Sequence, residues 1–190
     1  MKSLAVLDAI ICPEWEYRYH AFDTHWSAID EMGSIRNGSG DEVFVLFTPS
    51  GSIVFNHVHE HKPEGVRPDD YYAKIPEHFQ DAFAEPAFSS GSASHCFWRT
   101  QKSRNWQSAS PIEAIDPEGL FLLRTLDGMS PTYLSFAKEY FEIDLDADPV
   151  RRIYHWEPMT ESLARSISKD ITYSELLDNM DAVGYPFETS

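Results

Sequence analysis

The sequence is poor in cysteine, in basic residues and in long apolar runs. Its two cysteines, Cys12 and Cys96, lie far apart, and neither belongs to a Cys-x-x-Cys pair. This spacing excludes a disulfide framework and a cysteine-based zinc site, and it is typical of a protein from a reducing cytoplasm. No segment approaches the roughly 18 uninterrupted apolar residues of a membrane-spanning helix, so we expect none.

Basic side chains are outnumbered by acidic ones about two to one. The chain has 15 Lys and Arg against 31 Asp and Glu, which gives a formal net charge of −16. The excess is spread along the chain, since it amounts to −7 over residues 1–115 and −9 over residues 116–190. Such a surface repels phosphate backbones and anionic membranes, so we expect neither nucleic acid nor a membrane as partner.

Common catalytic motifs are also missing. There is no Gly-x-Ser-x-Gly elbow, no Walker loop and no Gly-x-Gly-x-x-Gly, so serine-hydrolase, P-loop and Rossmann functions have no support. Residues 144–148 alternate carboxylates as a calcium loop does. Pro149, however, occupies the place of the required glycine and His155 that of the bidentate glutamate, which excludes an EF-hand.

The segment Met1 to Cys12 has the outline of a lipoprotein signal but departs from it at two positions. Asp8 interrupts the apolar run, and Ile11 precedes the cysteine where a small residue is required. We therefore expect no export and a cytoplasmic location. The segment predicts a short amphipathic helix or strand that ends before Pro13.

The composition is that of a globular chain, with 42% apolar and 14% aromatic residues among 190. Strand patterns occupy residues 16–22, 43–47, 53–58, 95–100, 105–108 and 152–156. Helix patterns follow Thr24 and Thr160 and occupy residues 76–85, 130–142 and 172–183. Without a repeat or a linker, the chain predicts one α+β domain over residues 1–190. We expect a central, mostly antiparallel sheet of hairpins with flanking helices and a helical C-terminal part.

Residues 51–61 hold the one visible concentration of chemistry, because an apolar strand pattern runs into three histidines at alternate positions. If the extended backbone persists, the imidazoles of His57, His59 and His61 share one face. Neutral imidazoles bind divalent transition metals, and an i, i+2 pair at a strand end can converge on one ion. These three histidines and Glu64 are therefore the candidate metal ligands.

A catalytic metal requires a third protein ligand and an open position. Candidates for that third ligand are His61, Glu64, His20, His25, His78 and His95. Glu60 or Glu64 would serve as ligand or general base. The alternative interpretation needs no cofactor and treats the histidines as solvated polar residues at a strand exit.

The same segment matches the first half of the cupin motif through Gly51, His57, His59 and Glu64. The match ends there, because Tyr71 stands where the motif has glycine and no Pro-x-Gly-x-x-His follows. A cupin is also an all-β jelly roll, whereas the last third of this chain has helical patterns. The metallo-β-lactamase pattern His-x-His-x-Asp-His is not met either.

A wider pattern covers roughly two thirds of the chain and resembles a family of uncharacterised bacterial proteins. Its residues are Trp26, Met32, Ile35-Arg36, Gly38-Ser39-Gly40-Asp41-Glu42, Phe47, Gly51, His59-Glu60, Pro76 and Thr132-Tyr133. The Gly-Ser-Gly-Asp block is the most specific part. The resemblance implies a bacterial, cytoplasmic origin and transfers no activity to any residue. His57 and His61 are not features of that family, which weakens the metal hypothesis.

These observations favour a non-enzymatic, acidic, cytoplasmic protein that binds a partner with a basic surface. An immunity-type protein that masks a basic toxin would fit, because acidic surfaces steer basic partners. The alternatives are a small metal-dependent enzyme that uses the His57, His59 and His61 cluster, and a small-molecule binding fold. The pocket of such a fold would be lined by Trp98 and Trp106, packed across the hairpin of residues 95–108. The sequence carries no signal for the oligomeric state.

Overall fold

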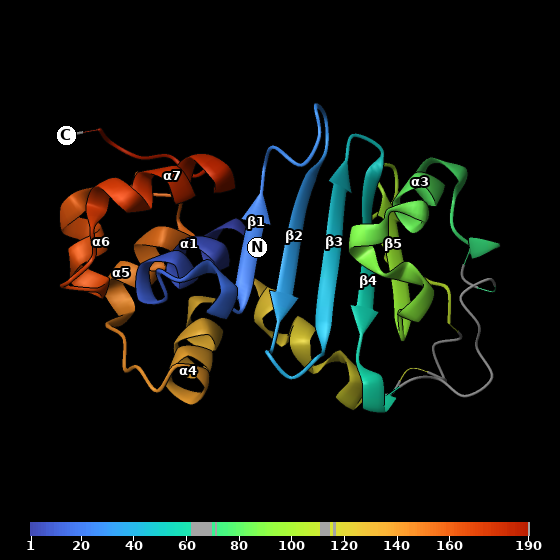
Figure 1. Ribbon diagram of the computed structural model, residues 1–190, viewed down its shortest axis with the longest axis horizontal. Coiled ribbons are helices and arrows are strands. Elements are labelled where there is room, and N and C mark those ends of the chain that lie inside the picture. The colour runs from blue at the N-terminus through green and yellow to red at the C-terminus, as the bar shows by residue number, and fades with distance from the viewer. Residues whose placement is uncertain (62–69, 71, 111–114, 116, 190) are drawn as a thin grey trace. The chain divides into compact units, whose positions relative to one another are not determined.

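The computed structural model describes residues 1–61, 70, 72–110, 115 and 117–189 (Figure 1). Its contacts divide the chain into two compact units, Met1–Thr24 with Leu123–Ser190, and His25–Leu122. We call the first the helical unit and the second the sheet unit. The predicted α+β class is confirmed, with an antiparallel sheet of hairpins, flanking helices and a helical C-terminal part. The assignment of residues 1–190 to one domain stays a prediction.

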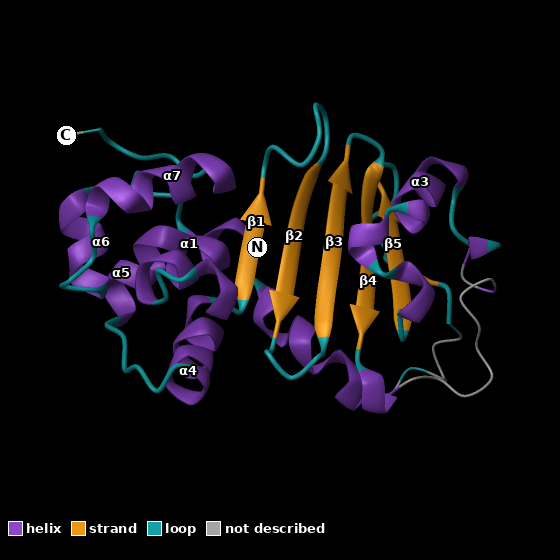
Figure 2. Ribbon diagram, viewed as in Figure 1, coloured by secondary structure: helices purple, strands orange, loops and turns teal. Residues whose placement is uncertain are grey.

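The strands of the sheet unit are antiparallel and follow one another in chain order (Figure 2). They are β2 (Glu31–Arg36), β3 (Glu42–Thr48), β4 (Gly51–His57), β5 (His95–Thr100) and β6 (Gln107–Ser108). The register places Phe44 opposite Phe55, and Phe55 opposite Cys96. Gly51 begins β4 with φ +146°, and a Cβ there would lie 2.1 Å from the carbonyl oxygen of Arg99. Glycine is therefore required where β4 approaches β5 so closely.

One face of this sheet is covered by short helices. They are the 3₁₀ helices η3 (Glu77–Phe79), η4 (Pro86–Phe88) and η5 (Ser90–Ser92) and the α-helix α3 (Gln80–Ala84), which lies over the sheet in Figure 1. Phe79 and Phe88 are buried in the same core as Phe55, and Phe83 packs partly buried against that core. The helical pattern over residues 76–85 thus exists for the reason predicted, with Pro76 preceding the first turn.

The helical unit is built around its first helix. Its elements are α1 (Lys2–Ile11), η1 (Trp15–Tyr17), β1 (His20–Asp23), α4 (Ser130–Tyr140), α5 (Ala147–Tyr154), α6 (Glu161–Ile167) and α7 (Tyr173–Val183). A further 3₁₀ helix, η7 (Pro117–Asp127), contains the boundary between the two units. Helix α1 is buried from Leu4 to Ile10 and contacts β1, α5, α6 and α7. Its end before Pro13 was predicted from the sequence.

The predicted helix start after Thr160 and the predicted helix end at residue 183 are confirmed. Thr160 begins α6 by accepting a hydrogen bond from the Leu163 N–H at 3.1 Å, and Gly184 ends α7 in the left-handed conformation. Thr172 precedes α7 as expected but makes no side-chain capping bond.

Four local predictions were wrong in whole or in part. The strand predicted over residues 16–22 begins only at His20, because Trp15–Tyr17 form η1. The segment after Thr24 is not a helix, because residues 31–36 form β2 and carry Met32 into the sheet core. Residues 152–156 do not form a strand: α5 continues to Tyr154, since Asp146 caps it and Val150 and Ile153 form its buried face. The aromatic pair of the hairpin does not form either. Trp98 is buried and donates to Gln107 Oε1 at 2.7 Å, whereas Trp106 is 49% exposed.

A buried carboxylate joins the elements of the helical unit. Asp8 in α1 has no exposed surface and accepts three hydrogen bonds. One oxygen takes the backbone N–H of His20 at 2.7 Å and faces its ring Nδ1 at 3.0 Å, and the other takes the Tyr133 hydroxyl at 2.7 Å. His20 Nε2 lies 2.9 Å from Thr125 Oγ1. Burial, reinforced by Asp8, raises the pKa of Tyr133 well above its ordinary value, so that its hydroxyl remains a donor.

Replacing Asp8 should therefore destabilise the protein strongly. Asp8→Ala leaves the His20 and Tyr133 donors buried without an acceptor, and we expect it to lower the free energy of unfolding by about 3–5 kcal/mol. The control is Asp178→Ala, because Asp178 is exposed on α7, and it should change stability by less than about 0.5 kcal/mol. Urea titrations followed by circular dichroism measure both. Equal losses in the two variants would contradict this role for Asp8.

Candidate functional site

The three histidines of residues 57–61 do not lie on one extended strand. Strand β4 ends at His57, and His59–His61 form the 3₁₀ helix η2. The turn between them is held by Ser94, whose hydroxyl donates to the Val58 carbonyl at 2.8 Å and faces the Val58 N–H at 2.9 Å. The alternation that would gather the imidazoles therefore stops at His57.

His57 is a buried residue of the sheet. Its ring is 6% exposed, with Nδ1 lying 3.2 Å from Ser92 Oγ. The ring centroid lies 5.8 Å from that of Phe44. These contacts hold the imidazole between the strand end and the helices that cover the sheet.

His59, in contrast, is exposed and held by a buried carboxylate. Its ring Nδ1 lies 2.6 Å from Asp41 Oδ1, and the same oxygen accepts its backbone N–H at 3.1 Å. Asn37 Nδ2 donates to the other oxygen of Asp41 at 2.9 Å. Burial alone would raise the pKa of Asp41, but the hydrogen bonds from His59 and Asn37 outweigh it and hold this pKa below its ordinary value.

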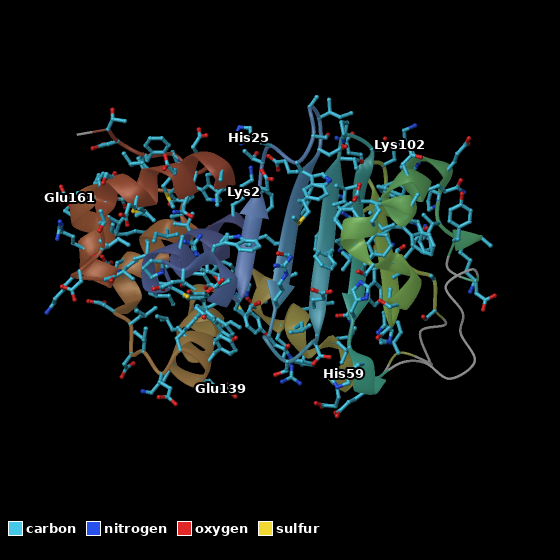
Figure 3. All side chains as sticks on the ribbon, in the orientation of Figure 1. Lys2, His25, His59, Lys102, Glu139 and Glu161 are labelled. Atoms are coloured by element: carbon cyan, nitrogen blue, oxygen red, sulfur yellow. The ribbon has the colours of Figure 1, made fainter. Side chains whose placement is uncertain are left out.

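This arrangement leaves one nitrogen of His59 available for chemistry. With the Nδ1 proton donated to Asp41, Nε2 of a neutral ring carries the lone pair, and the side chain is 61% exposed. Glu60 Oε1 lies 3.9 Å from Nε2. A carboxylate behind an imidazole is the arrangement that orients histidines which bind metals or act as bases. Figure 3 shows His59 at the surface, beside the end of β4.

The predicted metal site at His57, His59, His61 and Glu64 stays a prediction. Within the part of the chain that the structure describes, no group of three or more His, Cys, Asp or Glu side chains could hold an ion. His57 and His59 make contacts of their own, to Ser92 and to Asp41. Glu64 and the side chain of His61 lie outside the described residues.

The other candidates for a third ligand lie elsewhere. His20 belongs to the helical unit and bonds to Asp8, and His95 is buried with Nδ1 3.3 Å from the Asn56 amide nitrogen. His25 is exposed, and the ring of His78 packs against that of Phe79 with centroids 4.2 Å apart.

A second candidate site lies in the helical unit, on the segment between α1 and β1. Trp15 and Tyr17 are 60% and 66% exposed and alternate with the exposed carboxylates Glu14 and Glu16. We call residues 13–17 the aromatic segment. Sequence patterns did not reveal it, since the alternation of residues 16–22 was interpreted as strand. A tryptophan and a tyrosine among glutamates, directly after Pro13, were the available signal.

Arg18 fixes the backbone of the aromatic segment. Its guanidinium donates to the carbonyl oxygens of Cys12 at 2.8 Å and Pro13 at 2.6 Å, and to Asn179 Oδ1 of α7 at 2.6 Å. Arg18 therefore braces this turn, in the sense that its hydrogen bonds fix the backbone from which the exposed side chains of Trp15 and Tyr17 project.

One carboxylate of α7, that of Glu175, lies near this segment. Pro13, Arg18 and Glu175 line the same small pocket of about 190 Å³. Glu175, Asp178 and Asp181 are exposed and recur every third residue, so they share one side of α7. None of the three has an ion-pair partner among the described residues. The result is an aromatic surface bordered by uncompensated negative charge.

Comparisons with known proteins do not assign the chain, because no family model, no curated protein and no solved structure matches it. No helix in the described ranges is both long and apolar enough to cross a membrane. The function is therefore argued from the two sites themselves.

The bond between Asp41 and His59 makes a prediction about pH. Because the folded state lowers the pKa of Asp41, its stabilising effect is present above the unfolded-state pKa, about 3.9, and is lost as the pH falls through the folded-state value. We expect wild type to exceed Asp41→Asn by about 1–2 kcal/mol in free energy of unfolding at pH 6. This difference should shrink below about pH 4.

Urea titrations at intervals from pH 2.5 to pH 6.5 measure this difference. Asp178→Asn, on the exposed side of α7, is the control and should show no such trend. A difference between wild type and Asp41→Asn that stayed constant over the range would refute the assignment.

Proposed function

We propose that the protein is a non-enzymatic, cytoplasmic binding protein whose partner has a basic surface, and that the aromatic segment is its contact surface. The observation that carries the proposal is the exposure of Trp15 and Tyr17, at 60% and 66%, on a turn that Arg18 braces.

Exposed tryptophan and tyrosine on a braced turn suit a contact surface. These residue types dominate the binding energy of protein interfaces, because they bury a large area and have few rotatable bonds. A contact surface whose backbone is already fixed loses less conformational entropy on binding. Isolated exposed aromatics need no explanation, but here two of them lie two residues apart on one short turn, beside Glu14 and Glu16.

The charge of the helical unit favours a basic partner. Residues 1–24 and 123–190 contain 17 acidic and 8 basic residues, a net charge of −9. Uncompensated carboxylates on α7 and beside Trp15 attract a positively charged surface and raise the rate of association. Affinity should then fall as ionic strength rises, since exposed charges are screened over about 10 Å at 0.1 M salt. An immunity-type inhibitor that masks a basic toxin is one form of such a protein.

The test compares capture of cellular proteins by wild type and by the double variant Trp15→Ala/Tyr17→Ala. We expect wild type to enrich a basic protein at 50 mM salt, less of it at 200 mM, and the double variant to lose it. With that protein purified, the double variant should raise Kd at least about 30-fold, because each aromatic anchor contributes on the order of 1–2 kcal/mol.

The matched control is Trp106→Ala, which removes an exposed tryptophan from the sheet unit. It should bind as wild type does. If wild type enriches no protein, or if the double variant binds the enriched protein with unchanged Kd, the contact surface is not the aromatic segment.

A second candidate function is favoured by the bond between Asp41 and His59. A buried carboxylate behind an exposed imidazole is the outer-shell arrangement of metal-binding histidines, and Glu60 offers a second oxygen ligand nearby. A small metal-dependent enzyme centred on His59 is the activity this geometry would serve.

Elemental analysis of tag-free protein measures this alternative. It requires close to one zinc, iron or nickel per chain in wild type, and loss of that metal in His57→Ala/His59→Ala. His78→Ala, which removes an exposed histidine that packs on Phe79, is the control and should retain it. Metal content that the double substitution leaves unchanged would remove the alternative.

A further inference from the structure

The hairpin formed by β5 and β6 concentrates positive charge in an otherwise acidic protein. Arg99, Lys102 and Arg104 are all exposed. No carboxylate partner exists for any of the three within the described residues. Other arginines and lysines do have such partners, among them the pairs Arg36–Glu42, Lys138–Asp144, Arg151–Asp148, Arg152–Glu157 and Arg165–Glu161. Figure 3 shows Lys102 at the end of this hairpin.

An open pocket of about 560 Å³ lies at the same end of the sheet. Arg99 and Arg104 line it together with Thr48, Ser52 and Ser103, and no carboxylate is among its lining residues. We call it the hairpin pocket. In the register of the sheet, Ser52 lies opposite both Phe47 and Arg99, so these side chains form one row on one face.

The walls of the hairpin pocket are fixed by the backbone. The Gln101 N–H donates to the Ser50 carbonyl at 2.8 Å, which joins the turn after β3 to the turn after β5. The Ser103 N–H donates to the Thr100 carbonyl at 3.0 Å and closes the second turn. Gly51 lets the two strands approach, because a side chain there would collide with the Arg99 carbonyl. The arginines are thus anchored at their backbones, and the Arg99 guanidinium also lies 5.5 Å from the centre of the Trp106 ring.

Ser52 adds a hydrogen-bonding group to the hairpin pocket. Its side chain is only 8% exposed and lines the hairpin pocket. Its hydroxyl has no hydrogen-bond partner in the described part of the chain. This hydroxyl borders the open pocket beside two arginines, so it is placed to donate to an acceptor held there.

We propose that the hairpin pocket binds a small molecule through an oxyanion, either a phosphate or a carboxylate. Guanidinium groups match both anions because they can donate two parallel hydrogen bonds to one group, and Lys102 adds a further positive charge on the same hairpin turn. The volume lies in the range of small-molecule sites. The Ser52 hydroxyl adds a hydrogen-bond donor to the lining of the same pocket.

The net negative charge of the protein favours a small anion over an extended polyanion as the ligand. At −16, the protein repels an extended polyanion, whereas a small anion can be held within the screening distance of the arginines, about 10 Å at 0.1 M salt. A nucleic acid strand would extend beyond the three basic residues and be repelled by the net negative charge. This inference is independent of the aromatic segment and of the partner proposed for it.

Calorimetric titration with pyrophosphate and with citrate in 0.1 M sodium chloride tests the proposal. We expect one-to-one binding of at least one of them to wild type, and at least about tenfold weaker binding to Arg99→Ala/Arg104→Ala, since each charged hydrogen bond contributes substantially. Ser52→Ala should weaken binding about threefold or more. Binding of pyrophosphate alone identifies a phosphate site, and binding of citrate alone identifies a carboxylate site.

The control, Arg151→Ala/Arg165→Ala, removes the same charge from the helical unit and should bind as wild type does. Arg99→Lys/Arg104→Lys keeps the positive charge but removes the paired N–H donors of the guanidinium groups. This variant should bind with intermediate affinity, and it provides a test even if the alanine variant does not fold. The proposal is overturned if wild type binds neither anion, or if the control variant loses as much affinity as Arg99→Ala/Arg104→Ala.

Discussion

The helical unit depends on a charge that its first helix carries into the core. A carboxylate at Asp8, without exposed surface, is tolerable only where donors surround it, so His20 and Tyr133 must both reach it. This requirement determines where β1 and α4 pack against α1. The sheet unit uses a related device, because one oxygen of Asp41 meets both the backbone N–H and the ring of His59. One oxygen of Asp8 does the same for His20.

The two histidine–carboxylate pairs differ in what they leave exposed. His20 is 1% exposed and its second nitrogen faces Thr125, so the pair is fully used inside the helical unit. The side chain of His59 is 61% exposed and its second nitrogen is available. The same distinction singles out the aromatic segment, where Arg18 satisfies the backbone and the aromatic rings contribute little to the core. The exposed nitrogen of His59 and the exposed rings of the aromatic segment are not required for stability, so they are the candidates for a function.

Local patterns predicted the elements whose residues determine their own environment. Strands β3 and β4 follow from apolar runs separated by a turn at Gly51, and α1 from an amphipathic run that ends before Pro13. Strand β2 was missed because Met32 is held by its pairing with Leu46. The histidines were misplaced because Asp41 and Ser94, 18 and 36 residues from their partners, turn the chain after His57. Arg18 fixes the backbone of the aromatic segment and bonds to Asn179, 161 residues away, a contact that no local pattern reveals.

The central claim is that the protein acts through a partner held at the aromatic segment. Photo-crosslinking in living cells, with benzoylphenylalanine at position 15 and, as control, at position 106, tests it most directly. The account predicts a crosslinked product with one basic protein from position 15, weakened when Glu14 and Glu16 are replaced by glutamine, and none from position 106. Absence of any crosslink from position 15, or the same products from both positions, would contradict it.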